Sequence, residues 1–564
     1  MVTPRLGVAS STRGALWTLP LLVPVLAAAL YVRLSDPLSS PVIAAEDPYT
    51  HIVFVKEWLA NGRFGDSVAL GVGMYPPGFH ALVGALAAGA GIDHETLLRF
   101  IAPVLGAFSV AGVFFLARDQ AGPVAGVVAA VLMAATPEHI FRSGLGAPTA
   151  LDLALLPWFL LAIVRLGRDG PAWAPVAAVT GAALVLAHPW IMVVAALAAG
   201  FYVVVSAVAA EPRPTLLSTA LGAVVAAGLF FMSYSYKLAD DADRQRWVGD
   251  GVGDAGPLAF ATHAFAALPP WFVLAIPLAL AVAFLVPAWL ARTGRGTASA
   301  TAGVVGGLVL AGGITVGVAG IEHFPMFVDF EMMFGWTLVA LAVVGIATVP
   351  ATRGHAGIAA LGFGLATLPF TVVDVFDVWY LPHRTAVYLG LAMAILGGLG
   401  VGSVVETLLA RLRDRPIAGA GRAVTAVVAA SLLAVSLVPV AQGTPAWYRY
   451  YEDEQYEGIR EAASLANDDR LVVIVTGSWQ SNLFFKALVE RMGEQVHYRP
   501  EVYKDRASSE SFFKDMRGRD VYVWWDLHTF NATKNNHPWF LDQGAVRWSS
   551  ADGQTKLVRV EGLA

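Results

Sequence analysis

The residues best suited to do chemistry stand in a short run that follows the first apolar segment of the chain. This run holds two carboxylates, Glu46 and Asp47, and a histidine, His51. A carboxylate at a membrane edge can bind a divalent metal ion or act as a base. Pro48 suits the first turn of a helix, so Asp47 can also serve only as its N-cap. The apolar pattern of Ile52–Leu59 predicts an amphipathic helix on the membrane surface, with His51 at the interface.

A second candidate acid, Asp152, stands at the start of the apolar stretch Leu151–Val164. A carboxylate that enters a membrane span costs free energy, so Asp152 is a functional candidate and a possible ligand of a metal or substrate. Glu138 lies on the other side of the same loop, next to His139. These two residues equally suit a solvated loop.

The composition indicates which kind of protein holds these acids. Of the 564 residues, 57% are hydrophobic and only 14% are charged, against about 25% charged in soluble domains. The apolar residues form blocks of roughly 20, the length that spans a bilayer. We therefore expect a polytopic α-helical membrane protein in a cell membrane. The absence of cysteine excludes disulfides and thiolate metal sites, and a net charge of −5 argues against a nucleic-acid partner.

About thirteen spans are predicted, beginning with an uncleaved first segment. They lie near Leu16–Tyr31, Leu98–Leu116, Val124–Ala135, Leu151–Val164, Pro175–Ala187, Ile191–Ala209, Leu216–Met232, Trp271–Leu290, Ala302–Ala319, Gly335–Val349, Ile358–Val372, Ala386–Val401 and Ala423–Pro439. The apolar piece Gly78–Ala90 follows two prolines and is short, which indicates a surface or re-entrant segment.

Arginine in the short loops predicts the orientation. With a cytoplasmic N-terminus, the inner loops hold Arg5, Arg13, Arg118, Arg165, Arg168, Arg213, Arg292, Arg295, Arg353, Arg411, Arg413, Arg415 and Arg422, as the positive-inside rule requires. The outer side then receives loops 35–97, 234–270, 320–334 and 374–384. We expect a membrane domain over residues 1–441 and an extracytoplasmic domain over residues 442–564.

The pattern of the C-terminal part is typical of an α/β domain. Its expected helices are Tyr456–Leu465 and Asn482–Met492, and its expected strands are Arg470–Val475 and Asp520–Trp525.

The run Asp47-Pro48-Tyr49-Thr50-His51 resembles the first outer loop of the oligosaccharyltransferase catalytic subunit, in particular the archaeal, dolichyl-linked type. That family belongs to the GT-C superfamily of membrane glycosyltransferases. Its members have thirteen spans and an outer C-terminal domain, as predicted here from the apolar blocks. The resemblance implies a GT-C fold in which Asp47 is the principal catalytic or metal-ligating acid.

Two further loops resemble the family in part. Arg142-Ser143-Gly144 is similar to its second outer loop, which implies that Arg142 contacts substrate. The paired acids that follow in the family are absent, which leaves Asp152 as the nearest acid. Glu322 follows the ninth predicted span, where the family has an acid that positions metal and acceptor; Glu331 is the alternative.

Two more residues are assigned by the resemblance. Arg384 stands where the family has an arginine near the lipid-linked pyrophosphate, and a guanidinium suits phosphate; it can also snorkel at an interface. In the soluble domain the family has a Trp-Trp-Asp-Tyr-Gly motif that reads the acceptor sequon. Here only Trp479 is similar at that place, and Trp524-Trp525-Asp526 comes later, where a packed strand end is expected.

The sequence thus predicts a glycosyltransferase that moves a sugar or oligosaccharide from a polyprenyl (dolichyl-type) phosphate or pyrophosphate to a protein, lipid or polysaccharide acceptor at the outer membrane face, protein glycosylation included. The expected catalytic residues are Asp47 and Glu322; the expected substrate-binding residues are His51, Arg142, Arg384 and Trp479. The expected ligands of Mg²⁺ or Mn²⁺ are Asp47, Asp152 and Glu322, because hard cations prefer oxygen. The alternatives are a membrane transporter and a non-catalytic oligosaccharyltransferase-like protein.

Overall fold

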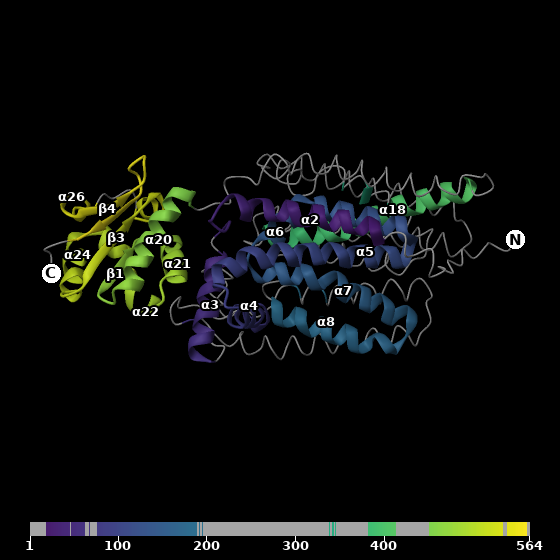
Figure 1. The fold of residues 1–564 in the computed structure, drawn as a ribbon, viewed down its shortest axis with the longest axis horizontal. Coiled ribbons are helices and arrows are strands. Elements are labelled where there is room, and N and C mark those ends of the chain that lie inside the picture. Colours follow the sequence, from purple (N-terminus) through teal and green to yellow (C-terminus); the bar gives the residue numbers. More distant parts are fainter. Residues whose placement is uncertain are drawn as a thin grey trace, which may run out of the picture. The chain divides into compact units, whose positions relative to one another are not determined.

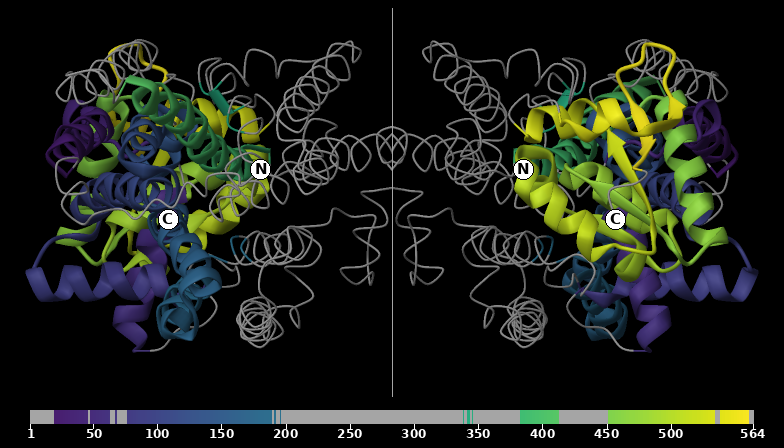
Figure 2. Two further views of the ribbon diagram at one scale, coloured as in Figure 1. Left: turned by 90° about the vertical axis from the view of Figure 1, so that its right-hand side faces the viewer. Right: turned by 90° about the vertical axis from the view of Figure 1, so that its left-hand side faces the viewer.

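The computed structural model describes residues 19–45, 47–62, 67, 76–188, 191, 195, 338, 341–342, 345, 382–412, 451–533 and 538–560. These residues belong to two compact units. Figures 1 and 2 show their helices and strands. The membrane unit takes its described residues from Met1–Leu34, Ala102–Gly144 and Pro148–Gly443. The second unit holds the first predicted outer loop and the predicted extracytoplasmic domain and is called the outer unit after those predictions. It takes its described residues from Ser35–Ile101, Leu145–Ala147 and Thr444–Ala564. Loop residues that follow the first span therefore share a unit with the C-terminal domain.

Helices make up the described part of the membrane unit. They are α2 (Leu19–Ser39), α5 (His94–Ala135), α6 (Pro137–Gly144), α7 (Pro148–Asp169), the 3₁₀ turn η2 (Pro171–Trp173), α8 (Ala174–Ala187) and α18 (Pro382–Leu412). Of the helices described, α2, α5 and α7 are long and apolar enough to cross a membrane. Of the other predicted spans, Pro175–Ala187 lies in α8 and Ala386–Val401 lies in α18. Most of the remaining ones lie outside the described residues, so the number thirteen stays a prediction.

Helix α5 is broken where two separate spans were predicted. Gly122 has φ 84° and ψ −179°, a left-handed conformation that glycine adopts without steric cost. Pro123 then begins the next helical segment, a position that suits its fixed φ. A Cβ atom on Gly126 would lie 2.9 Å from the carbonyl oxygen of Phe114, so the second segment returns along the first. The expected division between Leu98–Leu116 and Val124–Ala135 is confirmed.

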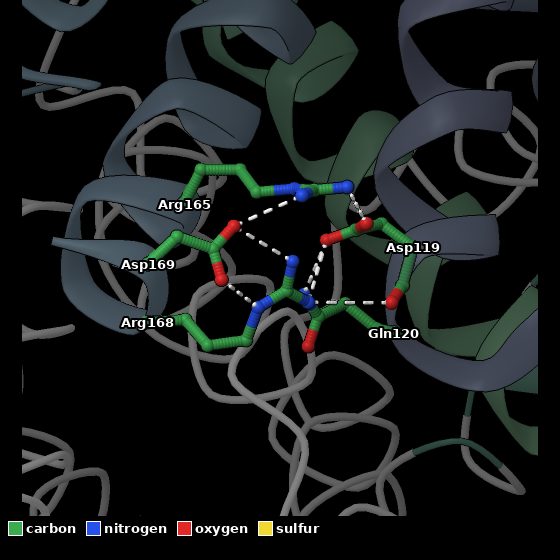
Figure 3. A network of polar contacts seen from close by, with 5 residues as sticks. All are labelled: Asp119, Gln120, Arg165, Arg168 and Asp169. Atoms are coloured by element: carbon green, nitrogen blue, oxygen red, sulfur yellow. Dashed lines mark hydrogen bonds and ion pairs between the residues drawn. The ribbon is translucent and has the colours of Figure 1, made fainter. Parts of the chain in front are cut away.

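An ion-pair network joins the end of α7 to the break in α5 (Figure 3). Arg165 and Arg168 both pair with the carboxylate of Asp119, the latter at 2.8 Å. Asp169 accepts from the same two arginines, at 2.9 Å and 2.7 Å. The four charges cancel, so the network holds two helix ends together without leaving a net charge between them.

Small residues allow α18 to approach α5. Gly398 and Gly402 are spaced as a Gly-x-x-x-Gly pair, and a Cβ on either would lie 2.5 Å from the Cβ of a facing alanine, Ala129 or Ala125. Lipid tails are as apolar as the helix side chains, so the hydrophobic effect does not drive helices together inside a membrane. Close van der Waals packing between small residues does so instead.

The C-terminal part of the outer unit is a five-stranded mixed sheet in the order β2-β1-β3-β5-β4. Its strands are β1 (Val472–Thr476), β2 (Val496–Tyr498), β3 (Asp520–Trp525), β4 (Ala545–Ser549) and β5 (Lys556–Arg559). β1 pairs in parallel with β2 and β3, and β5 is antiparallel to β3 and β4. The helices are α20 (Asp453–Asp468), α21 (Trp479–Leu488), α22 (Met492–Gln495), α23 (Pro500–Lys504), α24 (Arg506–Asp515), α25 (Leu527–Ala532) and α26 (Phe540–Gln543). The α/β prediction is confirmed, and β3 has the predicted bounds.

Helix α3 (Asp47–Asn61), the expected surface helix, packs inside the outer unit instead. The Tyr49 ring is fully buried and stacks on Phe484 of α21, with the ring centroids 3.8 Å apart. Ile52, Val53 and Val55 are each at most 1% exposed, so these three of the apolar residues assigned to lipid are covered by protein, whereas Leu59 is 42% exposed. The reason is that α4 (Pro77–Ala90) and α21 together surround the middle of the helix, and Trp58 packs over Gly84 of α4.

Lys56 closes this contact. Its ammonium donates to the carbonyl oxygens of Ala487 at 3.1 Å and of Val489 at 2.7 Å, at the C-terminal end of α21. A cation there also meets the negative end of the helix dipole. Burial lowers the pKa of Lys56 from 10.5 to about 8, an effect that Glu490 partly opposes.

The lowered pKa makes the stability of this contact depend on pH. Between about pH 8 and 10.5 the unfolded chain binds more protons at Lys56 than the folded chain, so the stability from this group rises with pH in that window. We expect the thermal unfolding midpoint of the wild-type chain in detergent to rise relative to that of Lys56→Met between pH 8 and pH 10. The exposed Lys514→Met is the control, and the difference between its midpoint and that of the wild type should stay the same over this range. A wild-type advantage over Lys56→Met that stays flat or shrinks with pH would contradict this assignment.

Candidate functional site

Asp47, the principal candidate acid, is the first residue of α3 and follows a constrained turn. Ala45 has φ 65°, a left-handed conformation that costs a non-glycine residue about 1–2 kcal/mol. The turn is held by side chains: the Tyr49 hydroxyl accepts from the Ile43 amide at 3.2 Å, and Ser40 bonds Asp453 of α20. Strain retained in this way marks a position that the surrounding structure determines. Asp47 is therefore placed by the C-terminal domain as well as by its own helix.

His51 lies one turn further along α3 and is 3% exposed. Its Nδ1 is 2.9 Å from Nε2 of His80 on α4, which is completely buried. One of these two ring nitrogens donates to the other, so the two histidines adopt complementary tautomers. The role of His51 in substrate binding stays a prediction. Sequence reasoning missed His80, although a histidine inside the apolar piece Gly78–Ala90 is the kind of residue that signals a polar partner.

Asp152 lies in the membrane unit and is completely buried in the first turns of α7. The hydroxyl of Tyr388 on α18 donates to its Oδ2 at 3.4 Å, and Nδ1 of His188 is 3.8 Å from the same oxygen. Within the described residues no hydrogen-bond partner reaches its Oδ1. Buried polar atoms normally have a hydrogen-bond partner, so a carboxylate oxygen that lacks one within the described residues is suited to a further ligand.

Arg142 lies on α6, where its Nε bonds Glu138 at 2.8 Å one helical turn away. The neighbouring Arg33 of α2 was not among the predicted residues. It is 2% exposed and donates to Ser143 at 2.8 Å, to His139 at 2.5 Å and to the Ala29 carbonyl at 2.9 Å. This network fixes α6 against α2. The signal for it was an arginine near the end of the first apolar helix.

Of the remaining predicted site residues, two lie within the described part of the chain. Trp479 begins α21 and makes an edge contact with Tyr498 of β2, with centroids 5.9 Å apart. Arg384 is the third residue of α18. Glu46 and Glu322, together with loops 234–270 and 320–334, lie outside the described residues. The convergence of these side chains on one site stays a prediction.

Trp524-Trp525-Asp526 is confirmed as a packed strand end. Asp526 is 1% exposed, and its Oδ2 accepts from Tyr451 at 2.6 Å, Ser481 at 2.8 Å and Trp524 at 2.7 Å. Its Oδ1 caps α25 by accepting from the Thr529 amide at 2.7 Å. Burial, and then the charge of Asp526, raise the pKa of Tyr451, which keeps the hydroxyl protonated as a donor. The motif thus fastens the end of β3 to α21 and α25.

A metal site needs several histidine or carboxylate side chains close together. No group of three or more histidine, aspartate or glutamate side chains gathers among the described residues. The described residues alone therefore do not make up a complete site for Mg²⁺ or Mn²⁺, and the expected ligand set with Glu322 stays a prediction.

Solved structures show what this architecture resembles. The oligosaccharyltransferase of Archaeoglobus fulgidus, in a complex with zinc and sulfate, is 14% identical; the match covers 95% of this chain and 72% of that one, with a TM-score of 0.57. ArnT from Cupriavidus metallidurans bound to undecaprenyl phosphate is 14% identical over 97% of this chain and 98% of that one, with a TM-score of 0.44. The mycobacterial arabinofuranosyltransferase AftD is 14% identical over 96% of this chain and 40% of that one, also with a TM-score of 0.44. No family model and no curated protein matches the sequence.

The chain therefore has a GT-C-like fold, as the resemblance of the Asp47 loop predicted. It is a helical membrane protein with a small C-terminal sheet. This conclusion rests on the oligosaccharyltransferase, because the other two TM-scores are low.

The contacts of Asp526 predict a large effect on stability. Replacing Asp526 by alanine removes the acceptor of three buried side-chain donors and also the cap of α25, so we expect a loss of about 3 kcal/mol or more. Asp505→Ala is the matched control, because Asp505 also caps a helix of this domain, α24, but is exposed. Loss of a cap alone costs about 1 kcal/mol. The stability of Asp526→Ala and of Asp505→Ala would be measured by heating the full chain and following the cleavage of its C-terminal domain by limited proteolysis. Equal losses of stability in the two variants would show that the Asp526 contacts add nothing beyond capping.

Proposed function

We propose that this chain is a GT-C glycosyltransferase that transfers a sugar or oligosaccharide from a polyprenyl phosphate or pyrophosphate to an acceptor at the outer membrane face. The observation that carries the proposal is the likeness in fold to an oligosaccharyltransferase over 95% of the chain. The ArnT structure was solved with undecaprenyl phosphate bound, a lipid of the class proposed here as the donor's carrier.

The position of Asp47 supports the catalytic assignment. It begins a helix whose middle is buried, after a turn with one strained residue, so its carboxylate is fixed to a rigid element. Preorganised groups of this kind orient an acceptor or take its proton without rearrangement during the reaction. In the proposed reaction Asp47 orients or deprotonates the acceptor, assisted by Glu322, while Arg384 binds the departing phosphate.

The remaining roles in the proposal are supporting ones. His51, Arg142 and Trp479 would contact substrates. Asp152 would share a divalent metal with Asp47 and Glu322, and such a metal, when bound, would stabilise the negative charge of the leaving phosphate. Transfer to protein acceptors is included in the proposal. The chain has no close match to the sequon-reading motif, so acceptors other than asparagine sequons fit it equally.

The test is transfer of labelled sugar from a lipid-linked donor by the purified full chain. We expect Asp47→Asn to reduce the rate by about 100-fold or more, the usual contribution of a positioned acid or base. Asparagine has nearly the same size and shape as aspartate, so the change removes the charge and the proton-accepting capacity but keeps the volume of the side chain.

Asp93→Asn is the matched control. Asp93 caps the start of α5 in the same unit, with its Oδ1 2.8 Å from the Thr96 amide. It should keep nearly full activity. Glu322→Gln and added EDTA test the remaining acid and the metal in the same assay. Wild-type activity in Asp47→Asn would remove the central assignment, and solute flux in proteoliposomes without transfer would favour a transporter.

A further inference from the structure

The outer unit contains an open groove of about 490 Å³ at the far end of α3 from Asp47. Glu57 contributes one wall, and the segment from α21 to β2 contributes the rest. Its lining residues are Glu57, Lys486, Met492, Gly493, Val496, His497, Tyr498 and Arg499. Since a helix rises about 1.5 Å per residue, Glu57 lies about 15 Å from Asp47 along α3, so the groove is separate from the candidate catalytic acid.

Positive charge predominates at the groove. Lys486 and Arg499 line it, against the single carboxylate of Glu57. Burial lowers the pKa of His497, and the charges of Arg499, Arg519 and Lys486 lower it further, which shows that three cations act on one point of the wall. His497 is therefore uncharged at neutral pH.

The two lining cations differ in how they are held. Lys486 is only 8% exposed, and burial lowers its pKa while Glu57 opposes that shift. Arg499 is half exposed and pairs with Glu501 at a long distance of 3.8 Å. An exposed pair of this length contributes little. A partly desolvated ammonium beside a loosely held guanidinium forms a favourable environment for an anion with several oxygens.

The remaining wall suits the uncharged part of a ligand. The Tyr498 ring is 38% exposed and is braced by its edge contact with Trp479. The Glu57 carboxylate, which also lines the groove, can accept from hydroxyl groups. A Cβ on Gly493 would meet no atom within 4 Å, so this side of the groove is open.

From this arrangement we propose that the groove binds a phosphate ester that also carries hydroxyl groups, with its phosphate on Lys486 and Arg499 and its hydroxyls toward Glu57. Such a group occurs in two forms, as a soluble polyol phosphate and as the headgroup of phosphatidylglycerol. The chemistry is the same in both, so the experiment distinguishes the sources.

The experiment measures binding to the full chain in neutral detergent by isothermal titration calorimetry, with no glycosyl donor present. The probes are inorganic phosphate, glycerol 3-phosphate and short-chain phosphatidylglycerol, with short-chain phosphatidylcholine as the lipid control. Saturable binding of glycerol 3-phosphate identifies a soluble ligand, whereas binding of phosphatidylglycerol alone identifies a lipid headgroup. Either result supports the site, independently of any transfer activity.

Two variants test the orientation of the ligand. Arg499→Gln should weaken binding of the preferred probe about tenfold, the loss of one charge-assisted hydrogen bond. Glu57→Gln should strengthen binding of inorganic phosphate, because it removes the only carboxylate in the lining, and should reduce the preference for the probe with hydroxyl groups. A merely structural role would not give changes of opposite sign.

Arg506→Gln is the matched control, since Arg506 is an exposed arginine of the same domain that pairs with Glu510 on α24. It should bind as the wild type does. The proposal is overturned if neither glycerol 3-phosphate nor phosphatidylglycerol binds saturably, if phosphatidylcholine binds equally well, or if Arg499→Gln and Arg506→Gln have the same effect.

Discussion

The packing of α3 on the C-terminal sheet domain determines where Asp47 stands. A stacked pair of aromatic rings, Tyr49 and Phe484, buries the first turn of the helix, and Lys56 holds its second half by two hydrogen bonds to the end of α21. Buried aromatic pairs contribute about 0.5–1.5 kcal/mol beyond the area that they bury. The candidate acid is thus positioned by residues more than four hundred positions away in the sequence. The segment that follows the first span is thus held by the packed interior of the sheet domain.

Charged residues in the membrane unit follow a different rule. Arg33 and Asp152 are buried in predominantly apolar helices, and an isolated charge there costs several kcal/mol. Arg33 is bonded to acceptors on α2, α5 and α6, so its contacts are explained by packing. Asp152 has one oxygen without a partner in the described part of the chain, and that difference makes it the stronger functional candidate of the two. The network of Asp119, Arg165, Arg168 and Asp169 shows the third case, in which charges cancel among themselves.

Much of the fold followed from local sequence patterns. The span boundary near Gly122, the separate helices α7 and α8, and strand β3 were predicted because glycine, proline and apolar runs act over a few residues. The short strands β2, β4 and β5 were not predicted, since their partly exposed residues carry weak patterns. The amphipathic run in α3 was assigned to lipid because a sequence shows that a face is apolar without showing what covers it. Likewise, no pattern reveals that His51 meets His80 or that Lys56 meets α21, because these contacts depend on tertiary packing.

The composition of the outer unit has a consequence for synthesis of the protein. The turn before Asp47 is held by Asp453, and the Tyr49 ring by Phe484, so neither constraint exists until the ribosome has added more than four hundred residues after α3. At about 5–20 residues per second, this delay is on the order of half a minute. During that time the membrane helices can assemble while the acid remains unplaced. A nascent chain that stops before the sheet domain would therefore have its membrane helices but lack both contacts that constrain the start of α3.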